Sequence, residues 1–206
     1  MSIKVNRIAD SLFNANCLRF GTFKIKSGAL SPYYIDLTRL LSSPTDLSTI
    51  AKAAADLIQQ IMKNEKIDKI ASIALKGALI APSIATLLNL PYIIIRKSEK
   101  NYGAKRRVVG APVVKNDHVL FFDDVVSEGL SKVEGIKPLK NQGACVKHLL
   151  VVVDREQGGK EKLEQNGYVV HSLAKISEIV KVLADSNKIS DNQAHAVLDY
   201  IHKIYH

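Results

Sequence analysis

Short apolar runs rich in β-branched residues alternate with amphipathic helical segments along most of this chain. The apolar runs predict strands at 69–75, 91–95, 118–122 and 146–153, and an edge strand at 168–172. Helices are predicted at 44–63, 80–88, 131–142, 175–184 and 191–205. Strands that are apolar throughout and alternate with helices are typical of a parallel sheet covered on both faces. The pattern therefore predicts a doubly wound α/β architecture.

Local signals suggest where two of these helices begin. Ser43 can cap the first, Pro44 suits its first turn, and Asp46 favours its positive end. In the second, Pro82 is expected in the first turn, because proline lacks the amide that a helix interior needs. The preceding Lys76-Gly77 pair is accordingly interpreted as a turn that ends the strand before it.

Residues 1–40 have a different character from the rest of the chain, since their elements look short, mixed and turn-rich. They are expected to form a small hood or flap over an α/β core at 41–206. At roughly 150 residues per domain, 206 residues suit a single domain with at most a small appendage.

Composition excludes several classes of protein. With 47% hydrophobic residues the chain is no disordered polyelectrolyte, and it has no apolar run long enough for a transmembrane helix. The N-terminus is too polar for a secretory signal, so a cytoplasmic location is expected. Two distant cysteines argue against a disulfide framework. The net charge of +9 fits an anionic partner: a nucleic acid, a membrane or a phosphorylated metabolite.

Polar groups follow the predicted strands, where ligands of open α/β sheets bind. Asp123 and Asp124 end one strand, and the turn after them contains Ser127, Gly129 and Ser131 before a helix begins. Such a turn can offer backbone N–H groups and a helix N-terminus to a phosphate. An ordinary acidic turn would look similar, but two aspartates at a buried edge are costly without a purpose.

A strongly basic stretch follows the strand at 91–95. Residues 96–107 contain six Lys or Arg and one Glu, which is +5 of the net charge of +9. Charge alone would suit a solvated loop or an RNA-contacting arm, whereas the position at a strand end favours a lid over a polyphosphate. Arg155, after another strand, can fork onto a carboxylate or phosphate, or simply pair with Asp154 on the surface.

No catalytic nucleophile or dinucleotide motif is recognisable. The six histidines show no ligand spacing with a supporting carboxylate, and the chain has no Ser/His/Asp or Cys/His arrangement. GxGxxG and GxxxxGK[ST] are also absent, which weighs against a dinucleotide enzyme or a Walker-type ATPase.

Taken together, six motifs resemble orotate phosphoribosyltransferase, and the resemblance extends over nearly the whole chain. They are FGTFKIKSG at 20–28, SPYYID at 31–36, ALKG at 74–77, RKSEKNYG at 96–103, DDVVSEGLS at 123–131 and DREQGGKEKL at 154–163. The first, second and last are specific to this family among phosphoribosyltransferases, and they look most similar to the domain fused to a decarboxylase in animal UMP synthases. The resemblance implies a type I phosphoribosyltransferase fold: a mainly parallel sheet flanked by helices, with a small N-terminal hood.

The implied reaction is a pentosyl transfer in pyrimidine biosynthesis. Orotate and phosphoribosyl pyrophosphate (PRPP) give orotidine monophosphate and pyrophosphate when a ring nitrogen displaces pyrophosphate at the anomeric carbon. Mg²⁺ and cationic side chains would stabilise the negative charge that grows on the leaving group. No covalent nucleophile is needed, which agrees with finding none.

The resemblance assigns roles at the matching positions. Asp123 and Asp124 are expected to act as catalytic residues that hold the ribose hydroxyls. Mg²⁺ is expected to be held mainly by PRPP, within reach of these two carboxylates. Ser127, Gly129 and Ser131 belong to the loop that surrounds the 5′-phosphate.

Cationic residues are assigned mainly to the pyrophosphate. Lys76 and Arg96 are expected to face it. Lys97, Lys100 and Tyr102 match a mobile loop that closes over the active site of the neighbouring subunit, with Lys100 as a catalytic residue. This arrangement implies a homodimer with shared sites.

Orotate recognition is assigned to three further residues. Lys26 and Tyr34 are expected to border the orotate pocket, and Arg155 to grip the orotate carboxylate. A guanidinium fork on a planar carboxylate selects orotate over uracil. A decarboxylase would not fit into 206 residues, so a separate protein is expected to supply it.

Two residues of the phosphate loop depart from the family pattern. Glu128 stands where a small or hydroxylated residue is usual, and Leu130 where a hydroxyl is common. A carboxylate at about 5 Å from a phosphate charge costs roughly 3 kcal/mol at an effective dielectric of 20. Either Lys132 neutralises Glu128 or the Glu128 side chain turns outward.

Two alternatives to an active enzyme remain open from the sequence. One is a catalytically weak paralogue that binds PRPP or a nucleotide as a regulator, which the two departures motivate. The other is an RNA-binding protein that uses residues 96–107, although this stretch lacks interleaved aromatic residues beyond Tyr102. A small, highly anionic substrate explains the positive charge better than a nucleic acid does. We therefore expect small-molecule substrates, with neither nucleic acid nor membrane as a partner.

Overall fold

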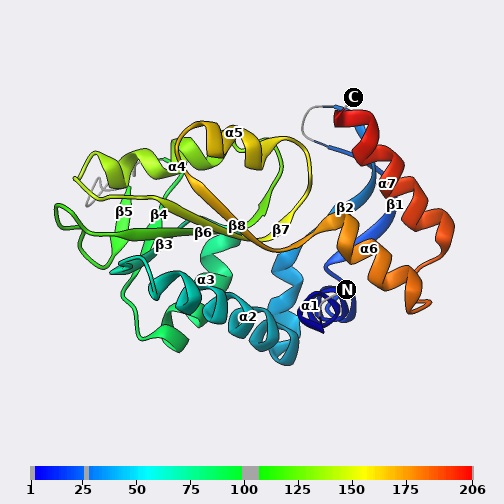
Figure 1. The fold of residues 1–206 in the computed structure, drawn as a ribbon, viewed down its shortest axis with the longest axis horizontal. Coiled ribbons are helices and arrows are strands. Elements are labelled where there is room, and N and C mark those ends of the chain that lie inside the picture. Colours follow the sequence, from blue (N-terminus) through cyan, green and yellow to red (C-terminus); the bar gives the residue numbers. More distant parts are fainter. Residues whose placement is uncertain (1–2, 26–27, 99–106, 206) are drawn as a thin grey trace.

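The structure, a computed structural model, describes residues 3–25, 28–98 and 107–205. Its centre is a six-stranded sheet in the order β5-β4-β3-β6-β7-β8 (Figure 1). The strands are β3 (Lys69–Ile73), β4 (Tyr92–Ile95), β5 (Val108–Gly110), β6 (Val119–Val126), β7 (His148–Asp154) and β8 (Val169–Lys175). All neighbouring pairs are parallel except β4 and β5, which are antiparallel. The predicted mainly parallel α/β sheet is thus confirmed.

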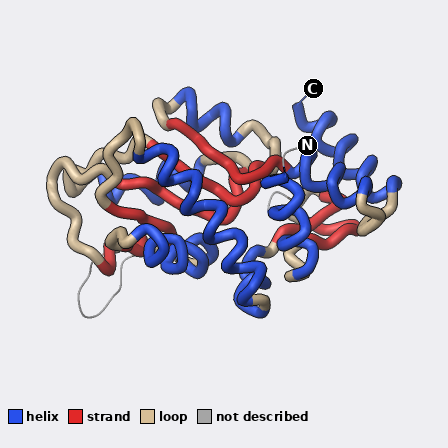
Figure 2. The backbone as a smooth tube through the Cα atoms, turned by 60° about the horizontal axis from the view of Figure 1, so that its bottom comes forward, coloured by secondary structure: helices blue, strands red, loops and turns tan. Residues whose placement is uncertain are grey.

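Helices cover both faces of this sheet (Figure 1). On one face lie α1 (Ile3–Asn14), α2 (Pro44–Met62) and α3 (Lys76–Leu88), and on the other lie α4 (Leu130–Lys140) and α5 (Gly159–Gln165). A separate two-stranded antiparallel sheet consists of β1 (Leu18–Lys24) and β2 (Leu30–Ile35), and it leads into the short helix η1 (Leu37–Ser42). The C-terminal helices α6 (Ile176–Asp185) and α7 (Asp191–Tyr205) lie beside this small sheet (Figures 1 and 2).

Two hydrophobic cores lie on opposite faces of the sheet, and β6 contributes to both. Leu120 and Phe122 face the larger core, whereas Phe121 faces the smaller one beneath α4. The larger core also takes in Leu12 of α1 and Tyr33 of β2. Fully burying one such side chain stabilises a fold by about 1.5–3 kcal/mol. The N-terminal elements are therefore packed into the same core as the sheet.

One helix and one strand differ from the prediction by four residues at one end, whereas the bounds of the other predicted elements shift by at most three residues. Helix α3 begins at Lys76 rather than at Ile80, so Lys76 and Gly77 are helical and Pro82 lies inside the helix. Proline there leaves the carbonyl of Ala78 without its helical donor. The Tyr92 hydroxyl donates to that carbonyl at 3.4 Å, which replaces the missing bond.

Strand β6 ends at Val126 rather than at Phe122, and several elements were not predicted, among them α1, β5 and α5. Because β6 pairs with β7 as far as Val126, Asp123 and Asp124 lie within a strand rather than after it. Helix α1 was not expected, since residues 1–40 were predicted to hold only short, mixed elements. Strand β5 was missed because three residues are too few for a periodic pattern.

Candidate active site

Asp123 and Asp124 are nearly fully buried, at 7% and 6% exposure, and successive strand residues point to opposite faces of the sheet. On one side, Lys132 of α4 donates to Oδ2 of Asp123 at 2.6 Å. Oδ1 of Asp123 accepts the backbone N–H of Asp124 at 2.9 Å. Both oxygens of Asp123 therefore have a donor from the protein.

Asp124 has a different environment. Its Oδ2 lies 3.9 Å from Nζ of Lys76, at the first turn of α3. Burial and the neighbouring charge of Asp123 raise the pKa of Asp124 to about 6, against the opposing effect of Lys132 and Lys76. Asp124 is the carboxylate of the pair with a partly exposed cation as its neighbour.

The loop between β6 and α4 is tightly held against the start of α5. Gly129 adopts a left-handed conformation, with φ of 80°, and precedes α4. A Cβ on Gly129 would lie 2.7 Å from the carbonyl oxygen of Gly159, and a Cβ on Gly159 would lie 2.2 Å from that of Ser127. Only glycine fits at these two positions without moving the loop. The arrangement presents backbone N–H groups and the N-terminus of α4 at the end of β6, as a phosphate site requires.

Glu128, in the same loop, is exposed. Lys132 is bonded to Asp123 and is buried, so of the two alternatives raised by the sequence the side chain of Glu128 turns outward. The expected repulsion of about 3 kcal/mol at an effective dielectric of 20 is weakened further by water around an exposed carboxylate.

Lys76 joins the small sheet to the core. Its Nζ lies 4.0 Å from Oδ1 of Asp36 and 5.9 Å from the centre of the Tyr34 ring. Tyr34 is 40% exposed and also contacts Phe23, with ring centres 5.8 Å apart. Two predicted site residues, Lys76 and Tyr34, therefore lie together, and Lys76 also lies beside Asp124.

Arg155 follows β7 and is oriented by β2. Its Nε donates to the Tyr33 hydroxyl at 3.2 Å, and its guanidinium lies 5.0 Å from the centre of the Tyr33 ring. Its backbone N–H donates to the carbonyl of Val126, at the end of β6. Burial raises the pKa of Tyr33, so this hydroxyl stays protonated. The guanidinium is thus held at the carboxyl edge of the sheet, and among the described residues only its Nε has a hydrogen-bond partner.

Comparisons of this chain with known proteins agree with one another. The model of the phosphoribosyl transferase domain matches residues 37–183. Orotate phosphoribosyltransferase of Pyrococcus horikoshii is 36% identical over 176 residues, which are 85% of this chain and 93% of that protein. The chain belongs to the orotate phosphoribosyltransferase family. Two larger proteins contain a similar region.

The bifunctional enzyme PyrF/PyrE of Nostoc sp. is 36% identical over 88% of this chain. The structure of Leishmania donovani UMP synthase superimposes with a TM-score of 0.86 over 98% of this chain at 32% identity. This chain spans 37% of the length of the former and 43% of the latter.

The structure gives the positions of some of the remaining residues predicted from the orotate phosphoribosyltransferase resemblance. Arg96 and Lys97 follow β4, and the backbone of Arg96 exchanges hydrogen bonds with Arg107. Ser127 and Gly129 lie in the loop after β6, and Ser131 lies in the first turn of α4. Three predicted residues lie outside the described part of the chain: Lys26, Lys100 and Tyr102.

Sequence reasoning missed two partners of the predicted orotate phosphoribosyltransferase residues. Lys132 was considered only as a partner for Glu128, although it is bonded to Asp123. Tyr33 was quoted as part of a motif but given no role, and it supports Arg155. Neither contact has a sequence signal, because the first pairs a helix with a strand and the second pairs residues 122 positions apart.

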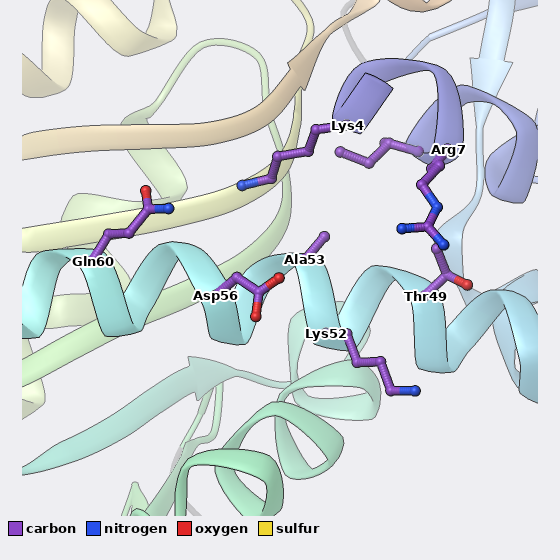
Figure 3. A pocket seen from close by; sticks show the side chains of 8 residues that line it. Lys4, Arg7, Thr49, Lys52, Ala53, Asp56 and Gln60 are labelled. Atoms are coloured by element: carbon purple, nitrogen blue, oxygen red, sulfur yellow. The ribbon is translucent and has the colours of Figure 1, made fainter. Parts of the chain in front are cut away.

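A cavity of about 400 Å³ lies elsewhere, between α1 and α2 (Figure 3). Lys4, Arg7 and Lys52 line it together with Asp56. The ammonium groups of Lys4 and Lys52 point in different directions, so the cations do not converge on one point (Figure 3).

Within the described ranges, no helix is both long and apolar enough to cross a membrane.

Proposed function

We propose that this chain is an orotate phosphoribosyltransferase, which transfers the phosphoribosyl group of PRPP to orotate and releases pyrophosphate. The observation that carries the proposal is Arg155, a guanidinium supported by Tyr33 at the same sheet edge as Asp124, Lys76 and the phosphate loop. A site for a sugar phosphate needs the last three groups. A guanidinium whose two NH₂ groups have no hydrogen-bond partner within the described ranges adds recognition of a planar carboxylate, which orotate has and uracil lacks.

The residues divide the work between binding and charge stabilisation. The loop from Ser127 to the start of α4 binds the 5′-phosphate through backbone N–H groups. Asp124 accepts hydrogen bonds from the ribose hydroxyls and orients the anomeric carbon. Lys76 and Arg96 stabilise the negative charge that grows on pyrophosphate as the glycosidic bond breaks. These two positive charges act mainly in the transition state. Replacing either residue should therefore lower kcat more than it weakens substrate binding.

Mg²⁺ is part of the proposal as a companion of PRPP. The described residues contain no group of three or more His, Cys, Asp or Glu side chains able to hold a metal ion. Both oxygens of Asp123 already accept protein donors, which leaves Asp124 as the carboxylate of the pair that fits the ion. The ion, when bound with PRPP, supplies positive charge to the pyrophosphate.

The direct test mixes orotate, PRPP and Mg²⁺ and measures pyrophosphate release, with uracil and hypoxanthine as competing bases. We expect turnover with orotate only. Arg155→Gln should raise the KM for orotate by about 10–100-fold, because it removes a charge-assisted fork worth about 1.5–3 kcal/mol. Arg7→Gln, an exposed change on α1, is the matched control and should leave this KM unchanged. Absence of turnover in folded protein at millimolar substrate would refute the proposal.

The alternative of a catalytically weak regulator rests on Glu128 and Leu130. The exposed side chain of Glu128 removes the main reason for expecting poor PRPP binding. If the alternative holds, the double variant Glu128→Ala, Leu130→Thr should bind PRPP much more tightly than the wild type. We expect a change of less than about threefold, since a solvated charge contributes little.

A homodimer with shared active sites is also part of the proposal. Mixing two inactive variants tests it, one changed in the loop at Lys100 and the other at Asp124. If the loop of one subunit serves the site of the other, mixed dimers regain part of the activity. If light scattering shows a dimer but the mixture regains no activity, the proposal of shared active sites is refuted.

We also propose that a separate decarboxylase associates with this chain, which co-purification tests. A cytoplasmic location is proposed as well, and cell fractionation tests it.

A further inference from the structure

Lys132 is a lysine in the interior of the protein. Its residue exposure is 4%, and its Nζ donates to Oδ2 of Asp123 at 2.6 Å. The side chains of the two residues are 6% and 9% exposed, so water screens this ion pair very little. The other lysines of α4, Lys137 and Lys140, lie in its last turn, and Lys137 pairs with Glu134 at the surface.

Stability alone is a poor reason for such a pair. Taking each ion out of water costs several kcal/mol, and replacing a buried ion pair with apolar residues of similar size is often neutral or stabilising. Val133 and Ile136, which lie near Lys132 on α4, pack into the smaller core. An apolar side chain would fit that setting, which suggests a role for the ammonium group itself.

The pair connects two parts of the candidate site. Lys132 lies in the first turn of α4, and its backbone N–H donates to the carbonyl of Gly129 in the phosphate loop at 3.1 Å. Its side chain reaches Asp123, which neighbours Asp124 in β6. One residue therefore ties the loop that would bind the 5′-phosphate to the strand that would bind the ribose hydroxyls.

Asp123 is held on its other side as well. Its Oδ1 accepts the N–H of Asp124, and a Cβ on Gly77 would lie 2.7 Å from Oδ1 and 2.9 Å from the Asp123 Cα. The carboxylate is therefore fixed between α3, α4 and its own strand. With both oxygens engaged, Asp123 has little freedom to turn toward a ligand, whereas Asp124 lies 3.9 Å from Lys76 and accepts a hydrogen bond from the backbone of Val125. The Lys76 contact is much longer than the 2.6 Å bond from Lys132 to Asp123, so it restrains the Asp124 carboxylate less.

We propose that Lys132 is a positioning residue for the sugar phosphate of PRPP, acting through Asp123. Its ammonium fixes Asp123 and neutralises that charge, so that Asp124 is the carboxylate presented to the ribose. The same contact holds the phosphate loop at a set distance from Asp124. This inference rests on the proposed function, and it assigns PRPP affinity, rather than orotate affinity, to a residue that does not touch the substrate. Lys132 also lowers the pKa of Asp124, in the direction that keeps Asp124 charged.

The test compares Lys132→Met with Lys132→Arg and with the control Lys137→Met on the same helix. Calorimetry gives the Kd for PRPP without turnover, and steady-state kinetics give both KM values and kcat. We expect Lys132→Met to raise the Kd and KM for PRPP by about tenfold or more, the loss of one charged hydrogen bond. The KM for orotate should change by less than about twofold. Lys132→Arg should restore part of the PRPP affinity, and Lys137→Met should match the wild type.

A double-mutant cycle with Asp123→Asn separates positioning from stability. If Lys132 acts through Asp123, the Lys132→Met change should raise the PRPP Kd far less in the Asp123→Asn background than in the wild type. This double variant carries a neutral pair of similar size, so it remains measurable even if Lys132→Met alone does not fold.

Three outcomes would overturn the inference: an unchanged PRPP Kd in folded Lys132→Met, equal effects in both backgrounds, or an equal rise in both KM values. If Lys132→Met does not fold, equal PRPP affinity of the double variant and the wild type would overturn it too. A wild type that binds PRPP but turns over no orotate refutes the proposed function alone, because the calorimetric comparison still decides the role of Lys132.

Discussion

The close approach of Gly159 to the phosphate loop makes Gly159→Ala a sharp test of the site. A Cβ at this position would lie 2.2 Å from the carbonyl oxygen of Ser127, 2.6 Å from its carbonyl carbon and 2.8 Å from the backbone nitrogen of Gly129. All three contacts are with backbone atoms, which cannot swing away as a side chain can. Either the loop or the start of α5 must therefore move by about 1 Å.

The size of the effect follows from this displacement. Overpacking typically lowers the free energy of unfolding by about 1–3 kcal/mol. Because the clash here is with backbone atoms, we expect a loss of about 3 kcal/mol. For a chain of this size that corresponds to a fall in Tm of about 6–12 °C. Because a misplacement of about 1 Å costs on the order of 100-fold in rate, kcat/KM for PRPP should fall by about that factor.

Gly158→Ala is the matched control, one residue earlier in the same turn. Gly158 has a φ of 77°, so alanine there is strained by roughly 1–2 kcal/mol, but its Cβ would meet nothing within 4 Å. Differential scanning fluorimetry gives the Tm, and pyrophosphate release at varied PRPP gives kcat/KM. We expect both variants to lose stability and only Gly159→Ala to lose PRPP efficiency. Equal losses of PRPP efficiency would refute the assignment of this loop to phosphate.

Two further predictions concern Arg155 and a buried histidine pair. Tyr33→Phe removes the hydroxyl that orients Arg155, so the KM for orotate should rise by about 2–10-fold, with the KM for PRPP unchanged, in the same assay. His148 and His171 lie with Nδ1 and Nε2 3.1 Å apart, and burial lowers the pKa of both below the usual 6.5. The unfolded chain therefore binds more protons than the folded one below about pH 6.5, so the free energy of unfolding should fall as the pH drops through that value. Urea titrations at several pH values should show this loss reduced in a His148→Leu, His171→Leu variant but retained in His195→Ala, an exposed control.

Predicting the sheet was possible because its signal is local. Buried parallel strands need mainly apolar runs, and the runs at 69–75, 91–95 and 146–153 satisfied that condition. One error arose where a tertiary contact compensates for a broken local rule. Pro82 lies inside α3, where the Tyr92 hydroxyl donates a hydrogen bond to the Ala78 carbonyl, and Tyr92 belongs to another element.

The candidate site divides in the same way. Asp123, Asp124, Arg155 and the glycine-containing loop were predicted as candidates from the sequence, since polar residues near strand ends and in turns form recognisable patterns. The support for those residues was not found. Tyr33 reaches Arg155 from a separate sheet, and no pattern of neighbours in the chain reports such a contact.

The sequence by itself determined the α/β class, the edge of the sheet that carries the polar groups, and the concentration of positive charge in residues 96–107. Tertiary structure alone decided how the two carboxylates differ. Lys132 fixes Asp123 from α4, Lys76 leaves Asp124 partly available from α3, and Glu128 turns to solvent. Two adjacent aspartates are the same residue type in the sequence. Only the groups packed around each one set its charge, its freedom to move and its access to a ligand.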